Sequence, residues 1–157
     1  MRKFNFFLLF VLILMLVFGG YFYFGSTLGA SAAPITASAN DYPEVFSSIQ
    51  AIVASGTAPQ TFSEPMPDST DGLTLIDATI ALQNRGLFAA EWLDIRVNGV
   101  AGDIAVYSLT GQGSDVAARS SAQINLKLIT RAPAETARTA VISYYVYGVQ
   151  RSIEVSF

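Results

Sequence analysis

The feature that most constrains this chain is a run of twenty-one residues near its start that carries no charge. Residues 4–24 read FNFFLLFVLILMLVFGGYFYF, and a helix of that length rises about 31 Å, close to the thickness of a bilayer's hydrocarbon core. Leu, Ile, Val and Phe dominate the run, and each favours membrane insertion by about 0.3–0.6 kcal/mol at mid-helix. The run therefore predicts a transmembrane helix that contacts lipid through apolar and interfacial aromatic side chains, among them Phe6, Leu9, Leu12, Leu16, Tyr21 and Tyr23.

The distribution of basic residues predicts the orientation of this helix. Arg2 and Lys3 precede the run, and no further Lys or Arg occurs before Arg85. Cytoplasmic flanks of membrane helices carry an excess of basic residues, so residues 1–3 are expected to form a cytoplasmic stub. The expected protein is a single-pass protein of the cell membrane, with its amino terminus in the cytoplasm and its C-terminal domain outside it.

The segment STLGASAAP, residues 26–34, contains an Ala-Ser-Ala triplet of the kind found at signal-peptide cleavage sites. A cleaved signal usually has an apolar core of about 7–15 residues followed soon by the cut. Here the strictest apolar part ends at Phe18, far from Ala30, and residues 21–24 form an aromatic cluster typical of a membrane interface. An uncleaved signal-anchor is therefore expected, and a secreted domain released by cleavage near Ala32 is the alternative.

The rest of the chain divides into three expected parts. Residues 25–41 are small and polar and predict a flexible or extended extracytoplasmic spacer. Residues 42–56 predict a short amphipathic helix with Pro43 in its first turn. Over residues 57–157 the apolar period becomes two, with turn signals such as Asn98-Gly99 between the segments. The expected fold class is mainly β, with a transmembrane α-helix, a short helix and an antiparallel immunoglobulin-like β-sandwich.

Three segments carry a resemblance to a known group of proteins. They are LTLIDATIALQNRGLFAAEWLDIRVNG, the later AQINLKL and the closing YYVYG hairpin that ends in IEVSF. Together they resemble the small sandwich domains of the LEA14/WHy group and similar membrane-anchored archaeal and bacterial ectodomains, over residues 73–157. The resemblance implies a binding or structural module and transfers no catalytic residue.

The residues that most often carry chemistry are missing or scattered. The chain has no His and no Cys, so it lacks the commonest general base, the commonest metal ligand and a thiol nucleophile. Residues 68–72, DSTDG, faintly resemble a calcium loop but lack the later bidentate Glu, and a solvated turn is expected. Glu91, Asp94 and Asp103 are expected at exposed strand positions rather than in a carboxylate pair. We therefore expect no enzyme activity, no cofactor, no metal site and no nucleic-acid partner.

Aromatic residues are the candidates for partner binding. Trp92 is out of phase with Leu93 and therefore lies on the opposite face of a regular strand. It is either an exposed anchor for a partner or a residue buried by a β-bulge or by the helix at residues 43–54, and burial is favoured. Tyr144, Tyr145 and Tyr147 place aromatics on both faces of one strand, which is typical of a covered central strand or of a partner-binding edge.

These features predict a non-enzymatic, membrane-anchored β-sandwich that acts as a binding or accessory subunit of a membrane or cell-envelope complex. The expected partners are the lipid bilayer and a membrane or envelope protein. The alternative is a structural subunit of a surface filament or layer, in which Ile35 to Asn40 pair with an open sheet edge of a neighbouring copy.

Overall fold

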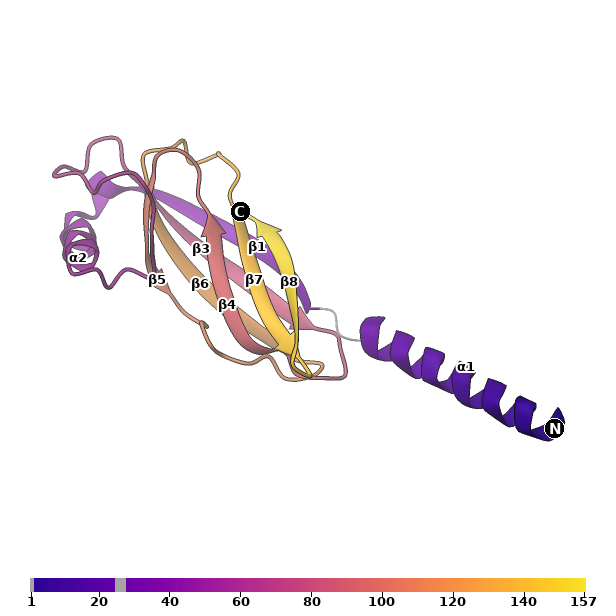
Figure 1. The fold of residues 1–157 in the computed structure, drawn as a ribbon. Coiled ribbons are helices and arrows are strands. Elements are labelled where there is room, and N and C mark those ends of the chain that lie inside the picture. The colour runs from indigo at the N-terminus through magenta and orange to yellow at the C-terminus, as the bar shows by residue number, and fades with distance from the viewer. Residues whose placement is uncertain (1, 25–27) are drawn as a thin grey trace.

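The computed structural model describes residues 2–24 and 28–157, and it contains two antiparallel sheets, a short helix at one end of them and an N-terminal helix that extends away (Figure 1). The mainly-β fold class with two α-helices is confirmed. The elements, in chain order, are α1 (Arg2–Phe24), β1 (Leu28–Ser38), the 3-10 turn η1 (Ala39–Asp41), α2 (Pro43–Ala54), β2 (Gln60–Thr61), β3 (Thr74–Asn84), β4 (Glu91–Asn98), β5 (Asp103–Leu109), β6 (Ser121–Thr130), β7 (Thr139–Val146) and β8 (Val149–Ser156).

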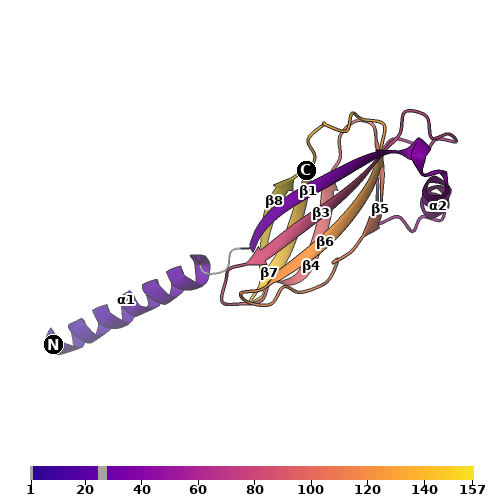
Figure 2. The ribbon, with the colours of Figure 1, turned by 180° about the vertical axis from the view of Figure 1, so that it is seen from behind.

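The two sheets differ in size and share an antiparallel pattern. The larger sheet has the strand order β1-β3-β6-β5-β2, and the smaller has the order β4-β7-β8. The chain crosses from one sheet to the other between β3 and β4, between β4 and β5, and between β6 and β7. Figures 1 and 2 show the sheets as two layers seen from opposite sides. The arrangement is sandwich-like, with side chains of both sheets between the layers.

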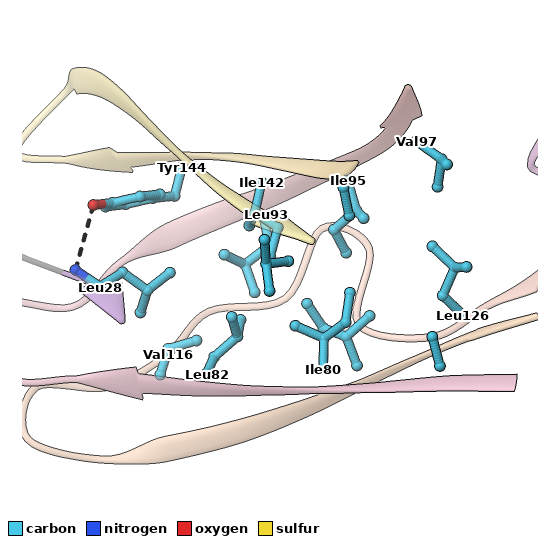
Figure 3. Close-up of a cluster of buried hydrophobic side chains, with 14 of the residues drawn as sticks. Leu28, Ile80, Leu82, Leu93, Ile95, Val97, Val116, Leu126, Ile142 and Tyr144 are labelled. Carbon is cyan, nitrogen blue, oxygen red and sulfur yellow. Dashed lines mark hydrogen bonds between the residues drawn. The ribbon is translucent and has the colours of Figure 1, made fainter. Parts of the chain in front are cut away.

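The main core lies between the two sheets and follows the period of two in the sequence. Residues that alternate along β3 and β4 point inward and meet residues of β6 and β7. Figure 3 shows this core, in which the buried Tyr144 reaches the start of β1 and its hydroxyl accepts a hydrogen bond from the Leu28 N–H at 3.4 Å. The inward-facing residues of the two strands are Ile76, Ala78, Ile80, Leu82, Leu93, Ile95 and Val97.

A second, smaller core lies under α2. Pro43 begins this helix, as expected, because a proline at the first helical position removes no intrahelical hydrogen bond. Phe46 and Ile49 are its buried residues, and they belong to a cluster with Ile104 and Ile129 of the larger sheet. The helix therefore covers one end of the outer face of that sheet.

The structure corrects the expected spacer at residues 25–41. Residues 28–38 form β1, and every one of them pairs with β3, from Leu28 opposite Asn84 to Ser38 opposite Thr74. Residues 39–41 form η1, and residues 25–27 lie outside the described residues. Seven of its eleven residues are Gly, Ala or Ser, whose small side chains give little period-two signal, so its stability comes from pairing along its whole length.

Helix α1 exposes its large apolar side chains. Phe6 is 77% exposed, and Leu9, Leu12, Leu16 and Tyr21 are exposed as well, whereas the Tyr23 side chain lies outside the described residues. Judged on the described residues, no helix of the chain is long and apolar enough to cross a membrane. The transmembrane assignment of residues 4–24 therefore stays a prediction.

Candidate binding surface at the helix-proximal end

The aromatic candidates gather at the end of the sandwich where β1 begins. Three connections form this end: the β3–β4 loop at residues 85–90, the β5–β6 loop at residues 110–120 and the β7–β8 turn at residues 147–148. Strand register places them together, because Leu28 lies opposite Asn84, and Gln83 lies opposite Ser121. Both ribbon views show these connections at the end of the sandwich nearest α1. We call it the helix-proximal end, and the end that carries α2 the distal end.

Trp92 is 72% exposed, so the favoured prediction of burial is wrong. The expected β-bulge is present, since the register of β4 against β7 shifts between Glu91 and Asp94. The bulge was expected to bury Trp92, and it has the reverse effect. Trp92 takes a left-handed backbone with φ of 53°, so both Glu91 and Trp92 stay outside before Leu93 returns to the core. The Trp92 N–H donates to Asp115 Oδ1 at 2.9 Å, which fixes the bulge to the β5–β6 loop.

The three tyrosines separate into one core residue and two surface residues. Tyr144 is buried and therefore takes no part in a partner surface. Tyr145 is 40% exposed beside Glu91 of β4, and Tyr147 is 67% exposed in the β7–β8 turn. Tyr147 and Gly148 both have positive φ, as a two-residue type I′ hairpin requires. The Tyr147 ring packs edge-on against Phe88, with ring centroids 4.4 Å apart.

The carboxylates singled out in the sequence lie in three different environments. Glu91 is exposed, as expected. Asp94 is half-buried and accepts hydrogen bonds from Gln112 Nε2 at 2.6 Å and from Arg96 Nε at 3.3 Å. The expectation of exposure is wrong for Asp103, which is 1% exposed and buried against Arg138. None of these groups lies in a paired-carboxylate arrangement.

The Asp103–Arg138 pair ties two loops together at the distal end. Arg138 Nε and Nη2 donate to Asp103 Oδ1 at 3.0 and 2.8 Å, and Nη2 also donates to Thr130 Oγ1 at 3.1 Å. Asp103 Oδ2 accepts the Val100 N–H at 2.9 Å, and Arg138 Nη1 donates to the Thr136 carbonyl at 2.8 Å. Sequence reasoning missed Arg138 because thirty-five positions separate it from Asp103. Its role is structural.

The outer edge of β4 is closed by side chains and by the backbone of the β5–β6 loop rather than by another strand. Gln112 Oε1 accepts the Ile95 N–H at 3.0 Å, and Gln60 Oε1 accepts the Val97 N–H at 2.9 Å. Gln60 Nε2 donates back to the Val97 carbonyl at 2.7 Å, so the primary amide mimics a strand partner. A hollow lined by Pro59, Gln60, Ile95 and Gln112 lies along this edge. An edge occupied in this way resists pairing with another chain.

The loop at residues 68–72 is a turn, as expected. Ser69 Oγ donates to Asp71 Oδ2 at 3.3 Å, and Gly72 has a φ of 67°. Within residues 2–24 and 28–157, no group of three or more His, Cys, Asp or Glu side chains is placed to hold a metal ion.

No protein-family model and no curated protein match this chain. Among solved structures, the crystal structure of a FixG-related protein from Vibrio parahaemolyticus is similar over 80% of this chain and 92% of that chain, with 12% sequence identity and a TM-score of 0.38. A likeness of this strength carries no argument about function.

Proposed function

We propose that this chain is a single-pass membrane protein in which α1 holds a non-enzymatic β-sandwich outside the cytoplasm, as a binding or accessory subunit of a membrane or cell-envelope complex. The observation that carries the proposal is the exposed apolar surface of α1. Its side chains from Phe6 to Phe18 include Phe, Leu, Ile, Met and Val, and the large ones lie open on the helix. Surface of this kind is stable in lipid or against other apolar helices and unfavourable in water.

The length of the apolar segment supports a span rather than a surface helix. The described side chains of α1 cover residues 5–21, while the uncharged sequence extends over residues 4–24 and the helical backbone over Arg2–Phe24. A helix that lies on a membrane has one apolar and one charged face. Here apolar residues surround the helix, which favours insertion across the bilayer.

The position of β1 supports the uncleaved form over the secreted alternative. Ala30, Ser31 and Ala32 lie within β1 and pair with Leu82, Ala81 and Ile80. A cut after Ala32 would remove the first half of the strand together with Leu28, which is buried in the main core. The secreted product would leave this part of β3 without its partner.

Strand order supports an immunoglobulin-like binding module. When β1, β3, β4, β5, β6, β7 and β8 are lettered A to G, the sheets become A-B-E-D and C-F-G, the order of constant-type immunoglobulin domains, with β2 added beside β5. Domains of this architecture commonly serve as recognition modules. The proposed relation to the LEA14/WHy group has the same implication.

The filament alternative gains no support from the position of its proposed donor segment. Residues 35–38 are already paired within the chain, with Ile35 opposite Asp77 and Ser38 opposite Thr74. Pairing with a neighbour would have to use the outer edge of β1, where Pro34 contributes no N–H group.

Co-purification from native membranes tests the proposal. The full chain is solubilised in a mild detergent, and its stoichiometric partners and its intact mass are measured by mass spectrometry. We expect a full-length species in the membrane fraction that carries at least one partner protein. A purely monomeric species in several detergents would contradict the accessory-subunit role, and a soluble species starting at Ala33 would contradict the anchor.

A further inference from the structure

Three residues other than glycine have a positive φ in the described chain, and all three lie at the helix-proximal end. They are Trp92, Arg119 and Tyr147, with φ of 53°, 55° and 52°. A left-handed conformation costs an L-residue about 1–2 kcal/mol, so none of these positions is neutral for stability. At these positions the left-handed backbone directs two large aromatic side chains and one basic side chain to the outside. Backbone strain gathered in this way points to a functional surface.

The surface that results has the composition of a membrane–water interface. Trp92, Tyr145 and Tyr147 combine an apolar ring with a polar N–H or O–H group, and Val149 beside the turn is also exposed. Trp and Tyr are enriched where proteins cross from lipid to water, because one part of the side chain favours each phase.

The connection to α1 is too short to hold this surface away from a membrane. Only residues 25–27 separate Phe24, the last residue of α1, from Leu28, the first residue of β1. A chain of that length spans at most about 14 Å between the two Cα atoms. The headgroup layer on one side of a bilayer is itself about 5–8 Å thick. The helix-proximal end therefore starts within, or directly above, that layer.

The difference in charge between the two ends of the sandwich also favours contact of the helix-proximal end with lipid. The helix-proximal end carries Arg85, Arg119 and Arg151 against the carboxylates of Glu91 and Asp115. At the distal end, Asp103 and Arg138 neutralise each other, and Arg131 pairs with Glu64. The remaining acidic residues of the distal end belong to neither of these pairs and are Asp41, Glu44, Asp68, Asp71 and Glu135. An orientation with the basic helix-proximal end toward anionic lipid and the acidic distal end away from it is therefore the favourable one.

We propose that the helix-proximal end of the sandwich docks on the lipid headgroups, with Trp92, Tyr145 and Tyr147 in the interfacial layer. The inference rests on the proposed function, because docking requires α1 to be inserted in the bilayer. It assigns the strained aromatic residues to lipid and leaves the distal end and the sheet faces for a protein partner.

Trp92 makes the inference directly testable, because it is the single tryptophan of the chain. The full chain is reconstituted in vesicles of zwitterionic and anionic phospholipids, and its fluorescence is compared with that in detergent. We expect a blue-shifted emission, strong quenching by phospholipids brominated near the glycerol, and protection from aqueous iodide. Full access of iodide to Trp92 in vesicles that carry the protein overturns the inference and leaves the anchor intact. A protein that fails to float with the vesicles contradicts the anchor itself.

Three variants, of which two are controls, keep the result specific. Trp92→Phe combined with Tyr42→Trp moves the only tryptophan to the distal end, next to α2, and should abolish quenching by brominated lipid. Arg119→Gln should lower the ratio of docked to undocked protein about fivefold, because a basic residue near an anionic surface contributes about 1 kcal/mol. Arg96→Gln, at an exposed position in the body of β4, should leave that ratio unchanged. Protection of Trp92 in native membranes but not in pure lipid vesicles would overturn the lipid assignment and identify a protein as the occupant.

Discussion

Removal of the Asp103 carboxylate should unfold the distal end at a much lower temperature. In Asp103→Ala, the Arg138 guanidinium stays buried and keeps only the Thr136 carbonyl and the Thr130 hydroxyl as acceptors. The Val100 N–H also loses its acceptor. Breaking a buried ion pair from one side costs about 3–5 kcal/mol, since the remaining charge is uncompensated.

The expected loss can be converted to a melting temperature. A domain of this size shifts by about 3–5 °C for each kcal/mol, so Asp103→Ala should lower the Tm by about 10–25 °C. Asp77→Asn is the matched control, because its pair with Lys127 is nearly half exposed on each side. Exposed pairs contribute about 1 kcal/mol or less, so the control should shift the Tm by only a few degrees.

Thermal unfolding of the full chain in detergent, followed by the circular dichroism of the β-sheets, measures both shifts. A double variant, Asp103→Leu with Arg138→Met, removes both charges and should recover most of the lost stability, because apolar replacement of a buried pair is often neutral. The reasoning would be refuted if Asp103→Ala cost no more than Asp77→Asn, or if the double variant were as unstable as the single one.

Three further predictions concern a turn, a sheet edge and pH. Gly102→Ala should cost about 2–3 kcal/mol of stability, because φ is 95° and an added Cβ would lie 2.8 Å from the Ala132 nitrogen. Gly113→Ala is the control, since an added Cβ there has open space and should cost about 1–2 kcal/mol. Equal urea midpoints for the two variants would contradict the steric argument. Gln112→Ala should lower stability by about 1 kcal/mol and speed hydrogen exchange at the neighbouring β4 amide, and unchanged exchange would count against edge closure. Burial, and to a smaller degree the charge of a nearby aspartate, raises the pKa of Tyr107. The raised pKa means that stability is complete below about pH 10 and declines as pH rises further, so Tyr107→Phe should lose less stability than the wild type in urea titrations at high pH.

The strands with strong apolar alternation are the part of the fold that the sequence predicts well. In β3, Ile76 and Ile80 are buried, as the period of two over residues 57–157 predicts, and Gly148 lies in the turn between the last two strands. Period-two patterns work here because each strand has one face on the core and one on water. The pattern fails for Val149, an apolar residue that is exposed because the tight turn places it at the rim of the sheet.

The misses share a cause, which is that the deciding contact is distant in sequence. The alanines of β1 give no clear pattern, and only β3 makes the segment a strand. The bulge at Trp92 leaves this side chain outside instead of burying it, and the backbone N–H of Trp92 bonds to Asp115, twenty-three positions later. Asp103 looks like an ordinary strand carboxylate until the topology brings Arg138 beside it. Local propensity carries no information about such partners.

The pairing of β1 has a consequence for the order in which the chain folds. Leu28 lies opposite Asn84 in the sheet and bonds to Tyr144, 116 positions later. A chain is synthesised from its amino end, so β1 appears first and waits for nearly the whole domain before its last contact forms. Folds dominated by such distant pairings form in milliseconds to seconds. Until β3 is synthesised, β1 is an unpaired strand, and its alanines, serines and glycine make it a weak template for aggregation because they offer little hydrophobic surface. The small side chains that leave β1 without a period-two signal in the sequence therefore also protect the incomplete chain from aggregation.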